Sequence, residues 1–101
     1  MPLFNNISGT APVEILTAGD NVSKIATIRL TNTHVSFPVV LDLFIDSDSL
    51  GKFYFAKGLT MASGSTIVLK EGLNFDNTAS GYSMYAQLRT DVTVDVVVFK
   101  S

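Results

Sequence analysis

Hydrophobic and polar residues alternate along most of this chain. A period of two is typical of β-strands with one buried face, because successive side chains of a strand point to opposite faces of the sheet. The clearest alternating segments are residues 22–32, 35–46, 82–89 and 92–99, and weaker ones are residues 12–16, 52–55 and 66–70. No stretch of ten or more residues has a helical period, so the pattern predicts an all-β protein.

Turn-forming residues separate these segments at intervals of roughly 8–12 residues, the spacing found in sandwiches and barrels. They comprise Gly19-Asp20, Asn32-Thr33, Asp48-Ser49-Leu50-Gly51, Asp76-Asn77 and Gly81. We therefore expect an antiparallel β-sandwich of about seven to eight strands, with either a jelly-roll or an immunoglobulin-like topology.

The alternation also predicts which side chains face the core. In residues 35–46 the odd positions form an apolar stripe that begins at Phe37 and ends at Ile45. In residues 22–32 the even positions are apolar, which places Ile25 on the outward face. Of the acidic residues within strands, Asp42 and Asp95 fall on outward faces and are expected to be solvated.

The 101 residues suit one domain, which we assign to residues 12–101. Residues 1–11 form a separate N-terminal segment in which Leu3, Phe4 and Ile7 stand among small and polar residues. This segment is interpreted either as a frayed end or edge strand of the sandwich, or as an extended arm that docks on a neighbouring subunit.

Composition narrows the function classes. The chain has no cysteine, so neither disulfides nor Cys-based zinc sites can form. The net charge of −2, with basic residues scattered singly, gives no basic patch for nucleic acid. No apolar run approaches the ~18 residues of a transmembrane helix, and we expect the N-terminus not to act as a signal peptide.

Candidate chemistry is sparse. His34, the single histidine, lies in a turn and has no cysteine or second histidine to form a catalytic or metal site with it. Asp46-Ser47-Asp48-Ser49-Leu50-Gly51 resembles the start of a calcium loop, but Leu50 stands where an oxygen ligand is needed and Lys57 where the glutamate is needed. A solvated hairpin explains this segment better than an ion site. We therefore expect no enzyme activity, no cofactor and no metal.

After one apolar face per strand has been assigned to the core, several large side chains are left over. These candidate interface residues are Phe4, Val40, Phe44, Tyr54, Tyr85, Val97 and Phe99. Charged residues make up only 16% of the chain, against about 25% in typical domains. Either the protein's own loops cover these side chains, or they merge into one patch that another subunit buries, which is the interpretation we favour.

Several segments between residues 12 and 99 resemble small virion proteins of tailed bacteriophages in their pattern of strands and turns. They are Val22–Asn32, Phe55–Met61, Ala62–Leu69, Glu71-Gly72-Leu73 and Asp91–Val96. The resemblance implies a β-sandwich that decorates a capsid or belongs to a neck or tail, attaching as a symmetric oligomer. No functional residue is transferred by it.

Our leading hypothesis is thus a structural virion protein, made in the host cytoplasm and located in the particle. Its expected partners are other copies of itself and virion proteins such as the major capsid or neck and tail proteins, without nucleic acid or membrane. The alternative is a carbohydrate-binding or adhesion module, in which Tyr54, Tyr82 and Tyr85 would stack on sugar rings.

Overall fold

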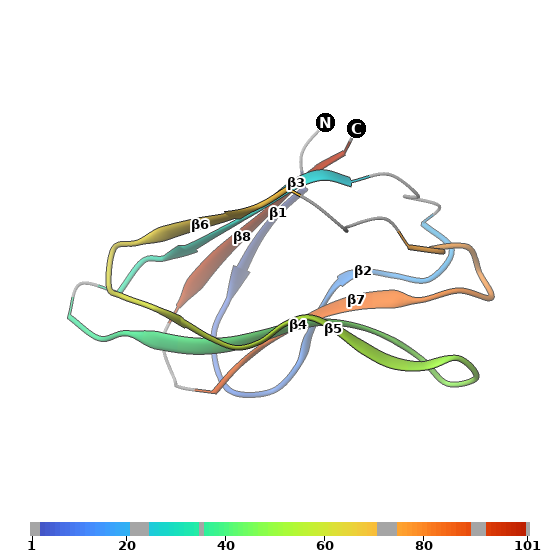
Figure 1. Ribbon diagram of the computed structural model, residues 1–101, viewed down its shortest axis with the longest axis horizontal. Coiled ribbons are helices and arrows are strands. Elements are labelled where there is room, and N and C mark those ends of the chain that lie inside the picture. The colour runs from blue at the N-terminus through green and yellow to red at the C-terminus, as the bar shows by residue number, and fades with distance from the viewer. Residues whose placement is uncertain (1–2, 21–24, 35, 71–74, 90–92, 101) are drawn as a thin grey trace.

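The structure, a computed structural model, describes residues 3–20, 25–34, 36–70, 75–89 and 93–100 (Figure 1). Its strands are β1 (Leu3–Ile7), β2 (Val13–Leu16), β3 (Ile25–Asn32), β4 (Val39–Ser47), β5 (Gly51–Met61), β6 (Thr66–Leu69), β7 (Ser83–Leu88) and β8 (Val94–Lys100). These strands form two antiparallel sheets that pack face to face, so the predicted all-β sandwich is confirmed. Within the described residues, no helix is long and apolar enough to cross a membrane.

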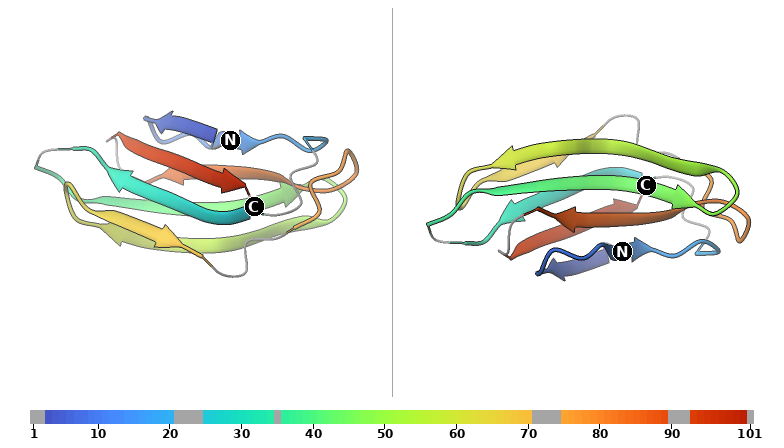
Figure 2. Two further views of the ribbon diagram at one scale, coloured as in Figure 1. Left: turned by 90° about the horizontal axis from the view of Figure 1, so that it is seen from above. Right: turned by 90° about the horizontal axis from the view of Figure 1, so that it is seen from below.

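In the part of the chain that the structure describes, each sheet has four strands, in the order β1-β8-β3-β6 in the first and β2-β7-β4-β5 in the second (Figure 2). The chain pairs with itself around the β4–β5 hairpin, so that β3 lies beside β6, β2 beside β7 and β1 beside β8. These successive pairs alternate between the two sheets. A long antiparallel hairpin rolled up in this way is a jelly roll, the first of the two topologies that the sequence left open. We call the sheet that contains β1 sheet A and the other sheet B.

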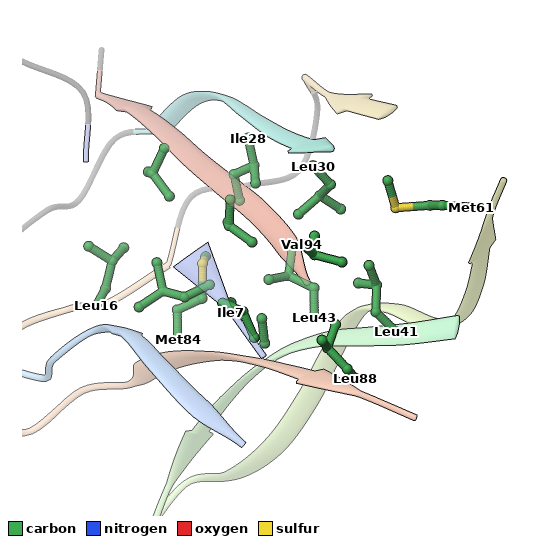
Figure 3. Packing of buried hydrophobic residues seen from close by; sticks show 14 of the residues in the cluster. Ile7, Leu16, Ile28, Leu30, Leu41, Leu43, Met61, Met84, Leu88 and Val94 are labelled. Carbon is green, nitrogen blue, oxygen red and sulfur yellow. The ribbon is translucent and has the colours of Figure 1, made fainter. Parts of the chain in front are cut away.

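One hydrophobic core fills the space between the sheets (Figure 3). Sheet A contributes side chains such as Ile28, Leu30 and Val96, and sheet B contributes Leu43 and Met84, all of them almost fully buried. Fully burying a side chain of this size stabilises the fold by about 1.5–3 kcal/mol, which offsets the entropy lost on folding.

Two residues depart from the predicted alternation. Phe37 was expected in the core but lies before β4 and is 60% exposed. Pro38 separates it from Val39, and proline cannot donate a hydrogen bond to a sheet. Ile25 was expected to face outward but is buried, because the pairing of β3 with β8 shifts register between Ile25 and Thr27 and reverses the alternation at that end.

The predicted short strand at residues 52–55 is instead the start of β5, the edge strand of sheet B. Its pairing with β4 shifts register twice, between Leu41 and Leu43 and between Leu43 and Phe44. Gly58, which lies opposite the first shift, has a φ of 66° that favours glycine. Three of the predicted strands begin at residues that lie outside the described part of the chain, namely Val22, Val35 and Val92.

Candidate interaction surfaces

The candidate interface residues lie on two opposite outer faces of the sandwich and do not form one patch. Phe4, Val97 and Phe99 belong to sheet A, on β1 and β8. The remaining candidates, Val40, Phe44, Tyr54 and Tyr85, belong to sheet B, on β4, β5 and β7. The sequence pattern shows that a side chain points away from the core, but not which sheet carries it.

On the outer face of sheet A, one row of paired residues crosses all four strands. Phe4 lies opposite Val97, which lies opposite Arg29, which in turn lies opposite Val68. Phe4 is 74% exposed, and the guanidinium carbon of Arg29 lies 5.4 Å from the centre of the Phe99 ring. Phe4, Val97 and Phe99 thus form an apolar patch on β1 and β8, and Arg29 separates it from Val68.

The neighbouring row on the same face is polar. Asn6 lies opposite Asp95, and its Nδ2 donates a hydrogen bond to Asp95 Oδ1 at 2.7 Å. Farther along the row, the hydroxyls of Thr31 and Thr66 lie 3.1 Å apart. These side chains bind one another, so the row forms an ordered polar border beside the apolar patch. A hollow of about 260 Å³ lies over β1 and β8, lined by Phe4, Asn5, Asn6, Asp95 and Val97.

Sheet B carries a corresponding row, of Glu14, Tyr85, Phe44 and Tyr54. The Phe44 ring lies 5.5 Å from both tyrosine rings, measured between centroids. The Tyr85 hydroxyl donates a hydrogen bond to Glu14 Oε2 at 3.2 Å. Burial and this contact with the carboxylate raise the pKa of Tyr85 above its ordinary value of 10.0.

The Phe44 side chain points away from the core, but neighbouring side chains of the same chain cover it. It is only 3% exposed, because Tyr54 and Tyr85 flank its ring and the Lys52 ammonium lies 4.6 Å from its centre. The candidate role of Phe44 as a contact residue is therefore not supported by its position. Of its neighbours, Tyr54 remains 42% exposed, and Tyr85 is half-buried.

Beside this row lies a charged pair that the sequence did not predict. Arg89 Nη2 donates to Asp42 Oδ1 at 2.9 Å and Arg89 Nε donates to Asp42 Oδ2 at 3.2 Å, while the Gly58 N–H donates to Asp42 Oδ1 at 2.7 Å. Asp42 was expected to be solvated but is only 7% exposed. No signal in the sequence pointed to this pair, because Gly58 lies outside the strand predicted at residues 52–55 and the bulge at Gly58 depends on the pairing of β4 with β5.

The network around Asp42 also sets its ionisation. Burial alone would raise the pKa of the Asp42 carboxyl. The Gly58 hydrogen bond and the Arg89 guanidinium stabilise the charged form more strongly, so the pKa lies below its ordinary value of 3.8. Asp42 therefore holds the β4–β5–β7 region together as a carboxylate and is not available as a proton donor near neutral pH.

The segment that resembles a calcium loop forms the end of β4 and the turn into β5. It borders a hollow of about 300 Å³, lined by Asp46, Ser47, Asp48, Ser49, Ala79, Ser80, Gly81, Ser83 and Tyr85. In the described part of the chain, no three acidic, histidine or cysteine residues gather closely enough to hold a metal ion. The hollow is instead lined with hydroxyls, two carboxylates and one aromatic ring.

His34 organises the turn between β3 and β4. Its Nδ1 accepts hydrogen bonds from the backbone N–H groups of Ser36 and Phe37, both at 3.1 Å. Its ring also lies 4.9 Å from that of Phe37, between centroids. These contacts explain the histidine in structural terms.

Comparison of the chain with protein-family models, curated proteins and solved structures finds no match.

Proposed function

We propose that this protein is a structural component of a tailed-phage virion, a capsid decoration or a neck or tail protein that assembles through the outer face of sheet A. The observation that carries the proposal is the apolar patch of Phe4, Val97 and Phe99. Phe4 alone leaves 74% of its surface in water, and burying such a ring against a partner contributes about 1.5–3 kcal/mol.

Two further features support this function. The jelly roll recurs in viral capsid proteins, although lectin domains and cupins share it, so the fold supports the proposal only by analogy. The low charge content of 16% leaves an unusually neutral surface, which suits a protein that others cover.

Particle composition tests the proposal. Mass spectrometry of purified particles of the phage that encodes the chain should find it in stoichiometric, symmetry-related copy number. Particles that lack the gene product should rebind the purified chain, whereas the Phe99→Glu variant should not rebind, because the carboxylate would lie in the apolar patch. Tyr54→Glu, on the other sheet, is the matched control. Absence of the chain from particles would contradict the proposal.

A carbohydrate-binding module is the second candidate, favoured by the hollow beside Tyr85. Its serine hydroxyls and the carboxylates of Asp46 and Asp48 match the hydrogen-bonding groups of a sugar, and Tyr85 supplies an aromatic surface. Tyr82 does not belong to this platform, since it packs on the core and against Phe53. A glycan array, repeated with Asp48→Ala, tests this function, and binding that survives the substitution would argue against this hollow.

A further inference from the structure

We infer that the free edge of β1 pairs with β1 of a second copy of this chain, in antiparallel register centred on Asn5. This inference rests on the proposed function and specifies how two subunits of the assembly would meet. It rests on the differences between the four edge strands, which are β1 and β6 in sheet A and β2 and β5 in sheet B.

Exposed sheet edges attract further strands, and proteins usually protect them with bulges, charged residues or very short strands. The edges of sheet B are protected in this way. β5 has two register shifts and carries Lys52 and Lys57, and β2 has only four residues, a register shift and Glu14.

The edges of sheet A differ from each other. β6 has four residues and is followed by Lys70. β1 contains no charged residue and no proline, and its five residues pair with β8 without any shift in register. Among the strands that the structure describes, β8 is the only partner of β1, and β1 lies at the outer margin of the sheet in the view from above (Figure 2).

A second copy fits this edge because the edge is complementary to itself. When two copies are related by a twofold axis perpendicular to the sheet, residues that lie opposite each other must come from the same face. Pairing Asn5 with the partner's Asn5 meets this condition and uses all five residues of β1, with Phe4 opposite the partner's Asn6.

This register also gives the exposed ring of Phe4 a place to bind. The partner's Phe4 would lie beside Asn6 on the outer face, where the hollow of about 260 Å³ is lined by Phe4, Asn6, Asp95 and Val97. One ring from each copy would thus enter the hollow of the other. The two apolar patches would join across the twofold axis into one larger apolar surface.

Charge does not oppose the pairing. Asp95 is the charged residue of the row that contains Asn6, and it already accepts a hydrogen bond from the Asn6 side chain. The two Asp95 residues of a dimer would be separated by three inter-strand spacings across the sheet, about 14 Å, and by two residues along the strands, about 7 Å. The resulting distance of about 16 Å exceeds the screening length of about 8 Å at physiological salt.

Sedimentation velocity at increasing protein concentration tests the dimer. A single strand edge is a small interface, so we expect a concentration-dependent monomer–dimer equilibrium. Phe4→Glu should abolish the dimer at every concentration where the parent forms it. Val68→Glu introduces the same charge on the same face, beyond Arg29 and near the opposite edge, and should leave the dimer intact. Thermal melting of both variants shows that each is folded.

Cysteine cross-linking tests the register, because the chain has no cysteine of its own. Directly opposed residues of antiparallel strands have Cα atoms about 4.5–5.5 Å apart, within the range that a disulfide spans. Asn5→Cys should therefore form a covalent dimer under mild oxidation, and Val68→Cys should not.

The outcomes separate the inference from the proposed function. A chain that stays monomeric, with Asn5→Cys linking no faster than Val68→Cys, overturns the dimer. The inference is also overturned if the dimer persists in Phe4→Glu. The same holds if Val68→Glu loses the dimer to the same extent as Phe4→Glu. If the chain is monomeric but Phe4→Glu loses particle binding, Phe4 serves the contact with another virion protein through the apolar patch, and the second copy is ruled out. If particles contain no trace of the chain, the proposed function fails while a measured dimer still stands.

Discussion

Arg89, the residue that follows β7, binds both carboxylate oxygens of Asp42, at 2.9 Å to Oδ1 and 3.2 Å to Oδ2. The pair lies on sheet B, where Asp42 is only 7% exposed and the Arg89 side chain is 46% exposed. The acid accepts a further hydrogen bond from the Gly58 N–H at the bulge of β5. One carboxylate therefore connects β4 with β5 and with the residue that follows β7.

Replacing Asp42 by alanine should lower the free energy of unfolding by about 1–3 kcal/mol, because the Gly58 N–H and the guanidinium both lose their acceptor in a partly buried site. Urea denaturation measures the change. Asp48→Ala, in the exposed turn, is the matched control and should change stability by no more than about 0.5 kcal/mol. If both variants lose the same free energy of unfolding, the hydrogen bonds to Asp42 do not stabilise the fold.

The same carboxylate should make stability depend on acid pH. Its pKa is lower in the folded state than the ordinary value of 3.8, so the folded protein binds its proton less readily than the unfolded chain does. The resulting stabilisation is complete above pH 3.8 and is lost as the pH falls from there through the folded pKa. The pKa of Asp76 is also lowered, by hydrogen bonds from Thr78. In Asp42→Asn, the decline in melting temperature at acid pH should therefore become shallower without vanishing, and an unchanged decline would contradict this role.

Phe44 should behave as a core residue although it points away from the main core. Phe44→Ala leaves a gap between Tyr54 and Tyr85 and should destabilise the fold by about 3–5 kcal/mol, the usual range for a buried phenylalanine. Tyr54→Ala removes a ring that is 42% exposed and should cost clearly less. Chemical denaturation of both variants compares them. If the two losses are equal, the Phe44 ring is not covered as the structure describes.

Gly81 should not tolerate a side chain. An added Cβ would collide with the carbonyl oxygen of Asp76, which also accepts the hydrogen bond from the Tyr82 N–H at 2.7 Å. Gly81→Ala must therefore shift the backbone of the 76–82 loop, and we expect a loss of about 1–3 kcal/mol. Gly64→Ala is the comparison, since no atom lies within 4 Å of its added Cβ and only the strain of its φ of 71° remains. A smaller change in melting temperature at Gly81 than at Gly64 would contradict this account.

The sequence by itself determined that the protein is an all-β sandwich and placed most of the strands. Alternation is a local property of neighbouring residues, so it identifies strands and inward positions such as Leu41 and Val96 without knowledge of the fold. It failed at Ile25 and Phe37, where a register shift and a proline interrupt the alternation.

The tertiary structure decided what depends on pairing between distant strands. The topology, the burial of Phe44 and the bond between Asp42 and Arg89 all arise from which strand lies beside which. The same holds for the separation of Phe4 from Tyr85 onto opposite faces. Strand order is set by the packing of the whole chain and leaves no local trace in the sequence, so only the folded structure could show that these outward residues form two surfaces.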